Sequence, residues 1–107
     1  MSATLDMIRS LVLQGAVRVS DHGYDELAND DLTVDDVLSG VADAVVVEDY
    51  PTFGKGPAVL VLQYTQKGDA IHVLWGIPRG SSAPAVLVTV YRPDPKKWAS
   101  DFKRRLP

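Results

Sequence analysis

Three side chains that suit acid–base and phosphate chemistry lie at two apolar segments in the last third of the chain. His72 lies inside the segment 71–77, Tyr91 ends the segment 86–91, and Arg92 follows it. An imidazole, with an ordinary pKa of about 6.5, can donate or accept a proton near neutral pH. A phenol and a guanidinium at a strand end can bind phosphate and stabilise developing negative charge. His72, Tyr91 and Arg92 are therefore the predicted catalytic residues, with His72 as acid or base.

Each of these assignments has a structural alternative. His72 could be a buried histidine that bonds to backbone or to a carboxylate, and Arg92 could pair with an acid of the first half of the chain. On a straight strand Tyr91 and Arg92 point to opposite faces, although Pro93 could twist both onto one edge. One open surface shared by the three side chains would favour an enzyme. A buried and paired His72 would favour a non-catalytic module.

Two further positions carry groups that bind ligands in other proteins. His22 and Glu26 are four residues apart, within side-chain reach on a helix. Two ligands are too few for a closed metal site, so no metal or cofactor is predicted and both residues are assigned a structural or accessory role. Lys55, between Gly54 and Gly56, could reach a phosphate, although the phosphate-binding loop motif of nucleotide-hydrolysing enzymes is absent.

Charge is divided unevenly along the chain. Residues 1–50 hold eleven acids and two bases, whereas residues 51–107 hold three acids and nine bases, for a formal net charge of −3. Five of the bases cluster near the end, at Lys96, Lys97, Lys103, Arg104 and Arg105. A local basic patch can bind phosphates despite a negative total. It can equally be the solvated face of a helix.

The spacing of apolar residues changes from a helical to a strand period near residue 44. Helices are predicted over about 5–12, 20–28 and 33–38, and strands over 45–47, 59–66, 71–77 and 86–91. Thr4, Ser20 and Thr33 are the predicted N-caps, with Asp36 completing a capping box. Residues 17–19 form a short extended piece, and residues 97–105 a last helical turn or two. The predicted fold is α+β, with N-terminal helices packed on a four-stranded, mainly antiparallel sheet and a short C-terminal helix.

Composition places the chain among ordinary globular proteins. Its 107 residues suit one domain spanning 1–107, and 46% are hydrophobic while 23% are charged. It contains no apolar run of about 18 residues, no signal-peptide pattern and no cysteine. These features predict a cytoplasmic protein with no membrane partner and no disulfide.

Several short motifs follow one another in a specific order. They are SDHGYDEL over 20–27, VVEDYP over 46–51, KGP over 55–57, LVL over 60–62, IHV over 71–73 and VTVYRPDP over 88–95, followed by Trp98. Their order and spacing resemble the bacterial family known as domain of unknown function 4258. The chain departs from it at Glu26, where many relatives have arginine.

The resemblance implies a RelE-like architecture and the toxin component of a type II toxin–antitoxin pair, acting as a metal-independent endoribonuclease on mRNA. The implied partners are an antitoxin protein and mRNA or the ribosome. The residues predicted to bind RNA or phosphate are Lys55, Lys96, Lys97, Arg104 and Arg105. Two alternatives stay open: a non-catalytic protein-interaction module, and a degenerate toxin that retains only antitoxin binding. The oligomeric state is not predicted.

Overall fold

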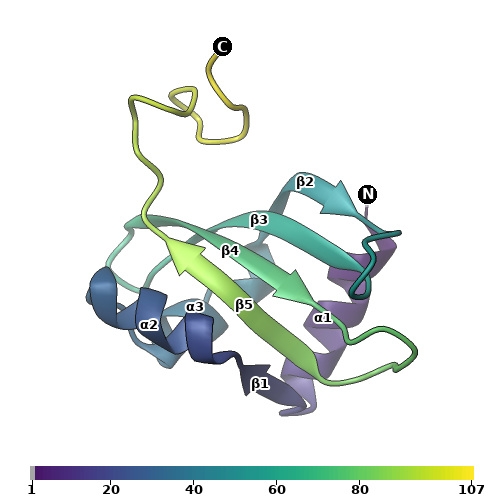
Figure 1. Cartoon of the computed structure of the whole chain (residues 1–107). Helices are drawn as coiled ribbons and strands as arrows, with labels where there is room; N and C mark the ends of the chain where they lie inside the picture. Colours follow the sequence, from purple (N-terminus) through teal and green to yellow (C-terminus); the bar gives the residue numbers. More distant parts are fainter. Residues whose placement is uncertain (1) are drawn as a thin grey trace.

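The helices of the described residues all lie before residue 44, and four of the five strands follow it, as the change of apolar period predicts (Figure 1). The computed structural model describes residues 2–107. Its helices are α1 (Ala3–Leu13), α2 (Asp21–Asn29), α3 (Val34–Leu38) and a 3-10 turn, η1 (Val41–Asp43). Its strands are β1 (Val17–Val19), β2 (Val45–Tyr50), β3 (Ala58–Tyr64), β4 (Ala70–Gly76) and β5 (Ala85–Tyr91).

The sheet has five strands in the order β1-β5-β4-β3-β2. Strands β2 to β5 pair antiparallel, as predicted, and β1 pairs parallel to β5. The prediction of four strands was wrong, because residues 17–19 pair with residues 85–87. A three-residue segment is too short to show the strand period, and its partner lies at the far end of the chain.

Side-chain caps begin all three α-helices. The Ser20 hydroxyl accepts the Gly23 N–H, and the Thr33–Asp36 capping box is present, as predicted. The cap of α1 is Ser2, whose hydroxyl accepts the Leu5 N–H at 3.1 Å, so the prediction of Thr4 was wrong. Thr4 is buried inside the first turn. The polar residue that precedes the helix satisfies its free N–H groups.

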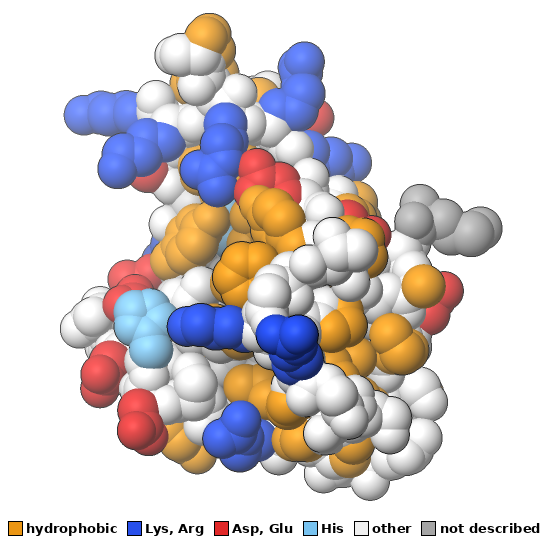
Figure 2. All heavy atoms as spheres, turned by 45° about the vertical axis from the view of Figure 1, so that its right-hand side comes forward, with side chains coloured by type: hydrophobic (Ala, Val, Ile, Leu, Met, Phe, Trp, Pro, Cys, Tyr) orange, Lys and Arg blue, Asp and Glu red, His pale blue; other side chains and the backbone are white. Residues whose placement is uncertain are grey.

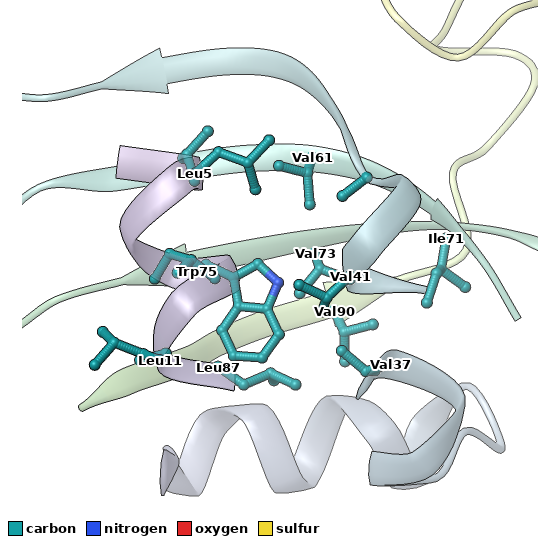
Figure 3. Packing of buried hydrophobic residues seen from close by; sticks show 14 of the residues in the cluster. Leu5, Leu11, Val37, Val41, Val61, Ile71, Val73, Trp75, Leu87 and Val90 are labelled. Atoms are coloured by element: carbon teal, nitrogen blue, oxygen red, sulfur yellow. The ribbon is translucent and has the colours of Figure 1, made fainter. Parts of the chain in front are cut away.

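The three α-helices pack on one face of the sheet and enclose an apolar core (Figure 3). Trp75 of β4 lies at its centre and is fully buried. Its indole N–H donates to the Gln63 side-chain oxygen at 3.1 Å, and the Gln63 amide donates to the Val37 carbonyl at 2.7 Å. This buried polar chain links β4, β3 and α3. Every polar atom in it has a partner, which burial requires.

Residues 94–106 form a small hairpin, named here the strap, where a short C-terminal helix was predicted. The Ala99 N–H donates to the Arg104 carbonyl at 2.8 Å, and Trp98 pairs with Arg105 in an antiparallel bridge. Phe102 has a φ of +59°, a left-handed conformation that a right-handed helix cannot include. The strap follows the end of β5 and lies at the top of the view, away from α2 and α3 (Figure 1).

Candidate functional site on the helix-free face

The sheet face opposite the helices contains the candidate site. Side chains alternate along a strand. Ile71, Val73 and Trp75 belong to the core beneath the helices, so His72 and Leu74 point to the other face. Neighbouring strands contribute further residues to this helix-free face, namely Leu60, Leu62, Val86, Val88 and Tyr91. The strap covers one part of the face, and the other part is open.

His72 and Tyr91 lie opposite each other on β4 and β5. His72 Nδ1 lies 3.1 Å from the Tyr91 hydroxyl oxygen, and the two rings meet edge to face with centroids 5.3 Å apart. Two of the three predicted catalytic residues are therefore in direct contact. The antiparallel pairing of β4 with β5 places them there.

The strap seals His72 from solvent. His72 is 0% exposed, and the Trp98 ring lies edge to face with it at a centroid distance of 4.4 Å. His72 Nε2 lies 2.7 Å from the Phe102 carbonyl oxygen. Because a carbonyl oxygen only accepts, Nε2 carries the proton. In the neutral ring Nδ1 is then the acceptor, and the Tyr91 hydroxyl donates to it.

An ion pair fastens the strap to the edge strand β2. Arg105 donates from Nε and Nη2 to the two carboxylate oxygens of Glu48, at 2.9 and 3.1 Å. The Tyr50 hydroxyl also donates to Glu48, and the Arg105 guanidinium lies 4.7 Å above the Trp98 ring. The Arg105 side chain is 63% exposed, so solvent screens the pair. The two parallel hydrogen bonds between Arg105 and Glu48 therefore orient the strap, and they contribute little to the free energy of unfolding.

These surroundings shift the pKa values of the cluster in consistent directions. Burial lowers the pKa of His72 below its ordinary value, and the hydrogen bond to Phe102 opposes only part of that effect. Burial raises the pKa of Tyr91. The hydrogen bond from Arg105 lowers the pKa of Glu48. The result near neutral pH is an uncharged imidazole and phenol beside an ionised carboxylate.

The lowered pKa of His72 predicts a specific loss of stability in mild acid. As pH falls below about 6.5, the unfolded chain binds a proton at this residue before the folded chain does. The free energy of unfolding should therefore fall between about pH 7.5 and 5.5, by at most about 1.4 kcal/mol for each pH unit. Urea unfolding followed by circular dichroism measures it.

His72→Gln is the matched control, since it differs from the wild type at this residue alone. The depressed pKa of Glu48 acts only below that residue's ordinary value of 4.5, outside this window. If the free energy of unfolding depends on pH in the same way in both proteins, the fold does not hold His72 neutral.

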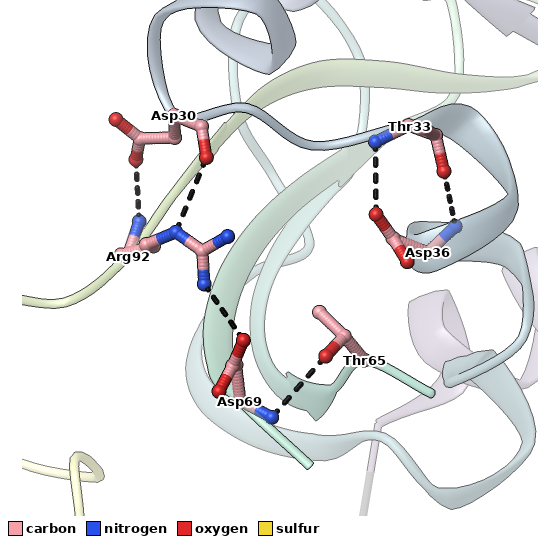
Figure 4. Close-up of polar contacts among 6 residues, drawn as sticks. All are labelled: Asp30, Thr33, Asp36, Thr65, Asp69 and Arg92. Carbon is pink, nitrogen blue, oxygen red and sulfur yellow. Dashed lines mark hydrogen bonds and ion pairs between the residues drawn. The ribbon is translucent and has the colours of Figure 1, made fainter. Parts of the chain in front are cut away.

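Arg92 lies apart from this cluster and binds the helical half of the chain (Figure 4). Its backbone N–H donates to the Asp30 carboxylate at 2.7 Å, and its Nε donates to the Asp30 carbonyl at 3.2 Å. Its Nη1 lies 3.2 Å from the Asp69 carboxylate. The structural alternative for Arg92 is therefore observed only in part, because the carboxylate paired with its guanidinium is Asp69 of the second half, whereas its carboxylate contact with Asp30 is made by the backbone N–H. His72, Tyr91 and Arg92 do not share one open surface.

The other predicted residues lie at several separate places. His22 Nε2 is 3.9 Å from Glu26 Oε1 on the exposed side of α2. Lys55 lies in the loop between β2 and β3. Lys96, Lys97 and Arg104 are exposed on the strap, where Arg105 also lies. Figure 2 shows Lys and Arg side chains at the top of the molecule and lower on the same face, with apolar side chains between them.

Four residues of the site escaped sequence reasoning: Glu48, Tyr50, Trp98 and Phe102. Trp98 is buried, at 5% exposure, and packs against His72. Phe102 contributes a backbone carbonyl, which leaves no trace in a sequence. The VVEDYP motif was the available signal for Glu48 and Tyr50, because an acid and a tyrosine two residues apart share a strand face.

The geometry allows a direct check for a metal-binding group and for a membrane-spanning helix. Within residues 2–107, no three His, Cys, Asp or Glu side chains gather as a metal-binding group. No helix in the described part of the chain is long and apolar enough to cross a membrane.

The comparison with known proteins identifies a family for this chain. No curated protein and no solved structure matches it. One family, described as "Domain of unknown function (DUF4258)", matches residues 19–92, which run from the end of β1 to the residue after β5. Helix α1 and the strap lie outside that range. The chain therefore belongs to the DUF4258 family, as its motifs predict.

Proposed function

We propose that this chain is the toxin component of a type II toxin–antitoxin pair, with a RelE-like architecture, and that it cleaves RNA without a metal ion. The observation that carries the proposal is the hydrogen-bonded pair His72–Tyr91 on the helix-free face, beneath a segment rich in lysine and arginine. A neutral imidazole is the group that such a reaction uses as a base.

The Tyr91 hydroxyl suits a proton-transfer role for His72. A hydroxyl can donate or accept, so Tyr91 satisfies Nδ1 in either neutral form of the ring. When Nδ1 carries the proton, Nε2 offers its lone pair to the side that the strap covers. There it can take the proton of a ribose 2′-hydroxyl while the 2′-oxygen attacks the adjacent phosphorus. The bond from phosphorus to the 5′-oxygen breaks, and that oxygen takes a proton from water. The products are a 2′,3′-cyclic phosphate and a 5′-hydroxyl.

Access to His72 requires movement of the strap. The Phe102 carbonyl and the Trp98 ring occupy the space that RNA would need. The strap is joined to β5 by the short connection 92–93, which contains Pro93, and it is fastened by the largely exposed pair Arg105–Glu48. An exposed ion pair of this kind is weak, because water and salt compete for both charges. RNA phosphates compete for Arg105 in the same way.

The test is cleavage of a single-stranded RNA oligonucleotide by the purified wild-type protein, with and without ribosomes. We expect cleavage that persists in EDTA, fragments with 2′,3′-cyclic phosphate ends by mass spectrometry, and no cleavage of DNA of the same sequence. A DNA strand is the matched control because it lacks the attacking 2′-hydroxyl. Intact RNA in both arms, with folded protein, would refute the nuclease.

A non-catalytic module that binds an antitoxin protein is the second candidate. The full burial of His72 and the engagement of both its ring nitrogens favour it. The binding of Arg92 to Asp30 and Asp69 also favours it, because this removes the cation predicted beside His72. A degenerate toxin would give the same result, with RNA left intact and antitoxin binding retained.

A further inference from the structure

The open part of the helix-free face is hollowed into a pocket of about 230 Å³. It lies beyond the strap, at the end of the sheet where Ala58 pairs with Gly76. Its apolar lining comes from Pro57, Ala58, Leu74, Ile77, Pro78, Val86 and Val88. Three larger side chains also line it: Arg18 from β1, and Phe53 and Lys55 from the loop between β2 and β3.

The loop that presents Lys55 is fixed by backbone pairing with the segment after β4. The Arg79 N–H donates to the Lys55 carbonyl at 3.0 Å, and the Ile77 N–H donates to the Pro57 carbonyl at 3.0 Å. Gly56 has a φ of +121°, and a Cβ there would overlap the Ile77 carbonyl oxygen. Only glycine fits this close approach. The backbone at Lys55 is therefore fixed beside the pocket, although its loop is rich in glycine and proline.

The two cations of the pocket, Arg18 and Lys55, differ from three arginines of the protein. Arg9, Arg92 and Arg105 each pair with a carboxylate. The ion pairs found within residues 2–107 involve neither Arg18 nor Lys55, and no carboxylate is among the described residues that line the pocket. Both side chains are exposed. The pocket thus combines uncompensated positive charge with an apolar floor.

We infer that this pocket binds one unpaired nucleotide of single-stranded RNA, with its phosphate held by Arg18 and Lys55 and its base lying on the apolar floor against Phe53. The inference rests on the proposed function and adds a binding position outside the His72 cluster. Aromatic stacking combined with cationic contacts is how proteins hold single strands. Phe53 is 53% exposed, which leaves its ring free to stack. The volume is below the range of about 300–1,000 Å³ that encloses drug-sized ligands, so it suits one ring system.

The test is a titration of methyl-labelled protein with adenosine 5′-monophosphate, followed by NMR. We expect the methyl signals of Leu74, Val86 and Val88 to shift. Lys55→Gln should weaken binding of the nucleotide about fivefold or more, because it removes a charge from the phosphate. Adenosine, which has no phosphate, should bind equally to the wild type and to Lys55→Gln. A short single-stranded RNA should shift the same signals, which separates an RNA site from one for free nucleotides.

Lys67→Gln is the matched control, because Lys67 lies in the turn between β3 and β4, at the other end of the strands. It should leave nucleotide binding unchanged. No shift of the pocket signals, or equal weakening by Lys55→Gln and Lys67→Gln, would overturn the inference. If the pocket binds the nucleotide but the protein leaves RNA intact, the proposed nuclease function is refuted and the inferred binding pocket is retained. If the protein cleaves RNA but the NMR signals of the pocket do not shift, the nuclease function is retained and the inferred binding pocket is refuted.

Discussion

His72→Gln is expected to abolish growth arrest when the protein is produced in a bacterial host, and to slow RNA cleavage by at least about 100-fold, the lower end of the effect of a general base. Glutamine can still donate a hydrogen bond toward the Phe102 carbonyl, so the strap should stay in place. It cannot exchange a proton near neutral pH. The measurements are growth after induction and the cleavage rate of a labelled RNA.

Two companion variants make this result specific. Tyr91→Phe removes the hydroxyl that bonds to His72 Nδ1, and should shift the pH dependence of cleavage as well as lower its rate. Arg92→Ala removes the side-chain contacts with the Asp30 carbonyl and the Asp69 carboxylate and should lower the melting temperature while leaving the pH dependence unchanged. If folded His72→Gln protein arrests growth as fast as the wild type, the chemistry does not use His72.

Trp75→Ala is expected to lower the free energy of unfolding by about 3–5 kcal/mol, the usual cost of removing a large aromatic side chain from a core. Trp75 is fully buried at the centre of the core, between the sheet and the helices. Small domains are stable by only about 5–15 kcal/mol in total, so a large share would be lost. Urea unfolding followed by circular dichroism measures the change.

The control separates the bulk of the Trp75 ring from its hydrogen bond. Trp75→Phe keeps most of the apolar contact but leaves the Gln63 side-chain oxygen without its donor. We expect it to cost about 1–3 kcal/mol, the penalty of an unsatisfied buried acceptor. A loss of less than about 1 kcal/mol for Trp75→Ala would mean that the core does not close around this ring as described.

The fold was predictable wherever a local pattern determines it. Strands β3 to β5 and the caps Ser20 and Thr33 follow from apolar period and capping chemistry, and the structure confirms them within a few residues. Strand β1 was missed because its pairing with β5 is not local. The strap was mistaken for a helix because its basic residues resemble a helix end. Its conformation is set by tertiary contacts, Trp98 with His72 and Arg105 with Glu48.

The candidate site was predictable only in part, for a related reason. His72 and Tyr91 share a strand pair, so antiparallel pairing positions them together. Arg92 is the next residue, yet alternation along the strand turns it toward Asp30 and Asp69. The pocket at Lys55 depends on Arg18, from an extended segment whose pairing with β5 the sequence does not reveal. The residue types predicted phosphate chemistry. Which side chains contact one another depends on the register of the five strands, which the sequence does not give.

The strap has a consequence for how tightly any ligand of His72 can bind. The strap is part of the same chain and is joined to the sheet by a few residues. It therefore competes with a ligand for the surface around His72, at an effective concentration on the order of millimolar. The measured dissociation constant of a ligand is its intrinsic value divided by the fraction of molecules in which the strap is open. A chain that is open one time in about a hundred would bind about a hundredfold more weakly than the bare site. A polyanion that also binds the lysines of the strap holds it away, and so recovers part of that loss.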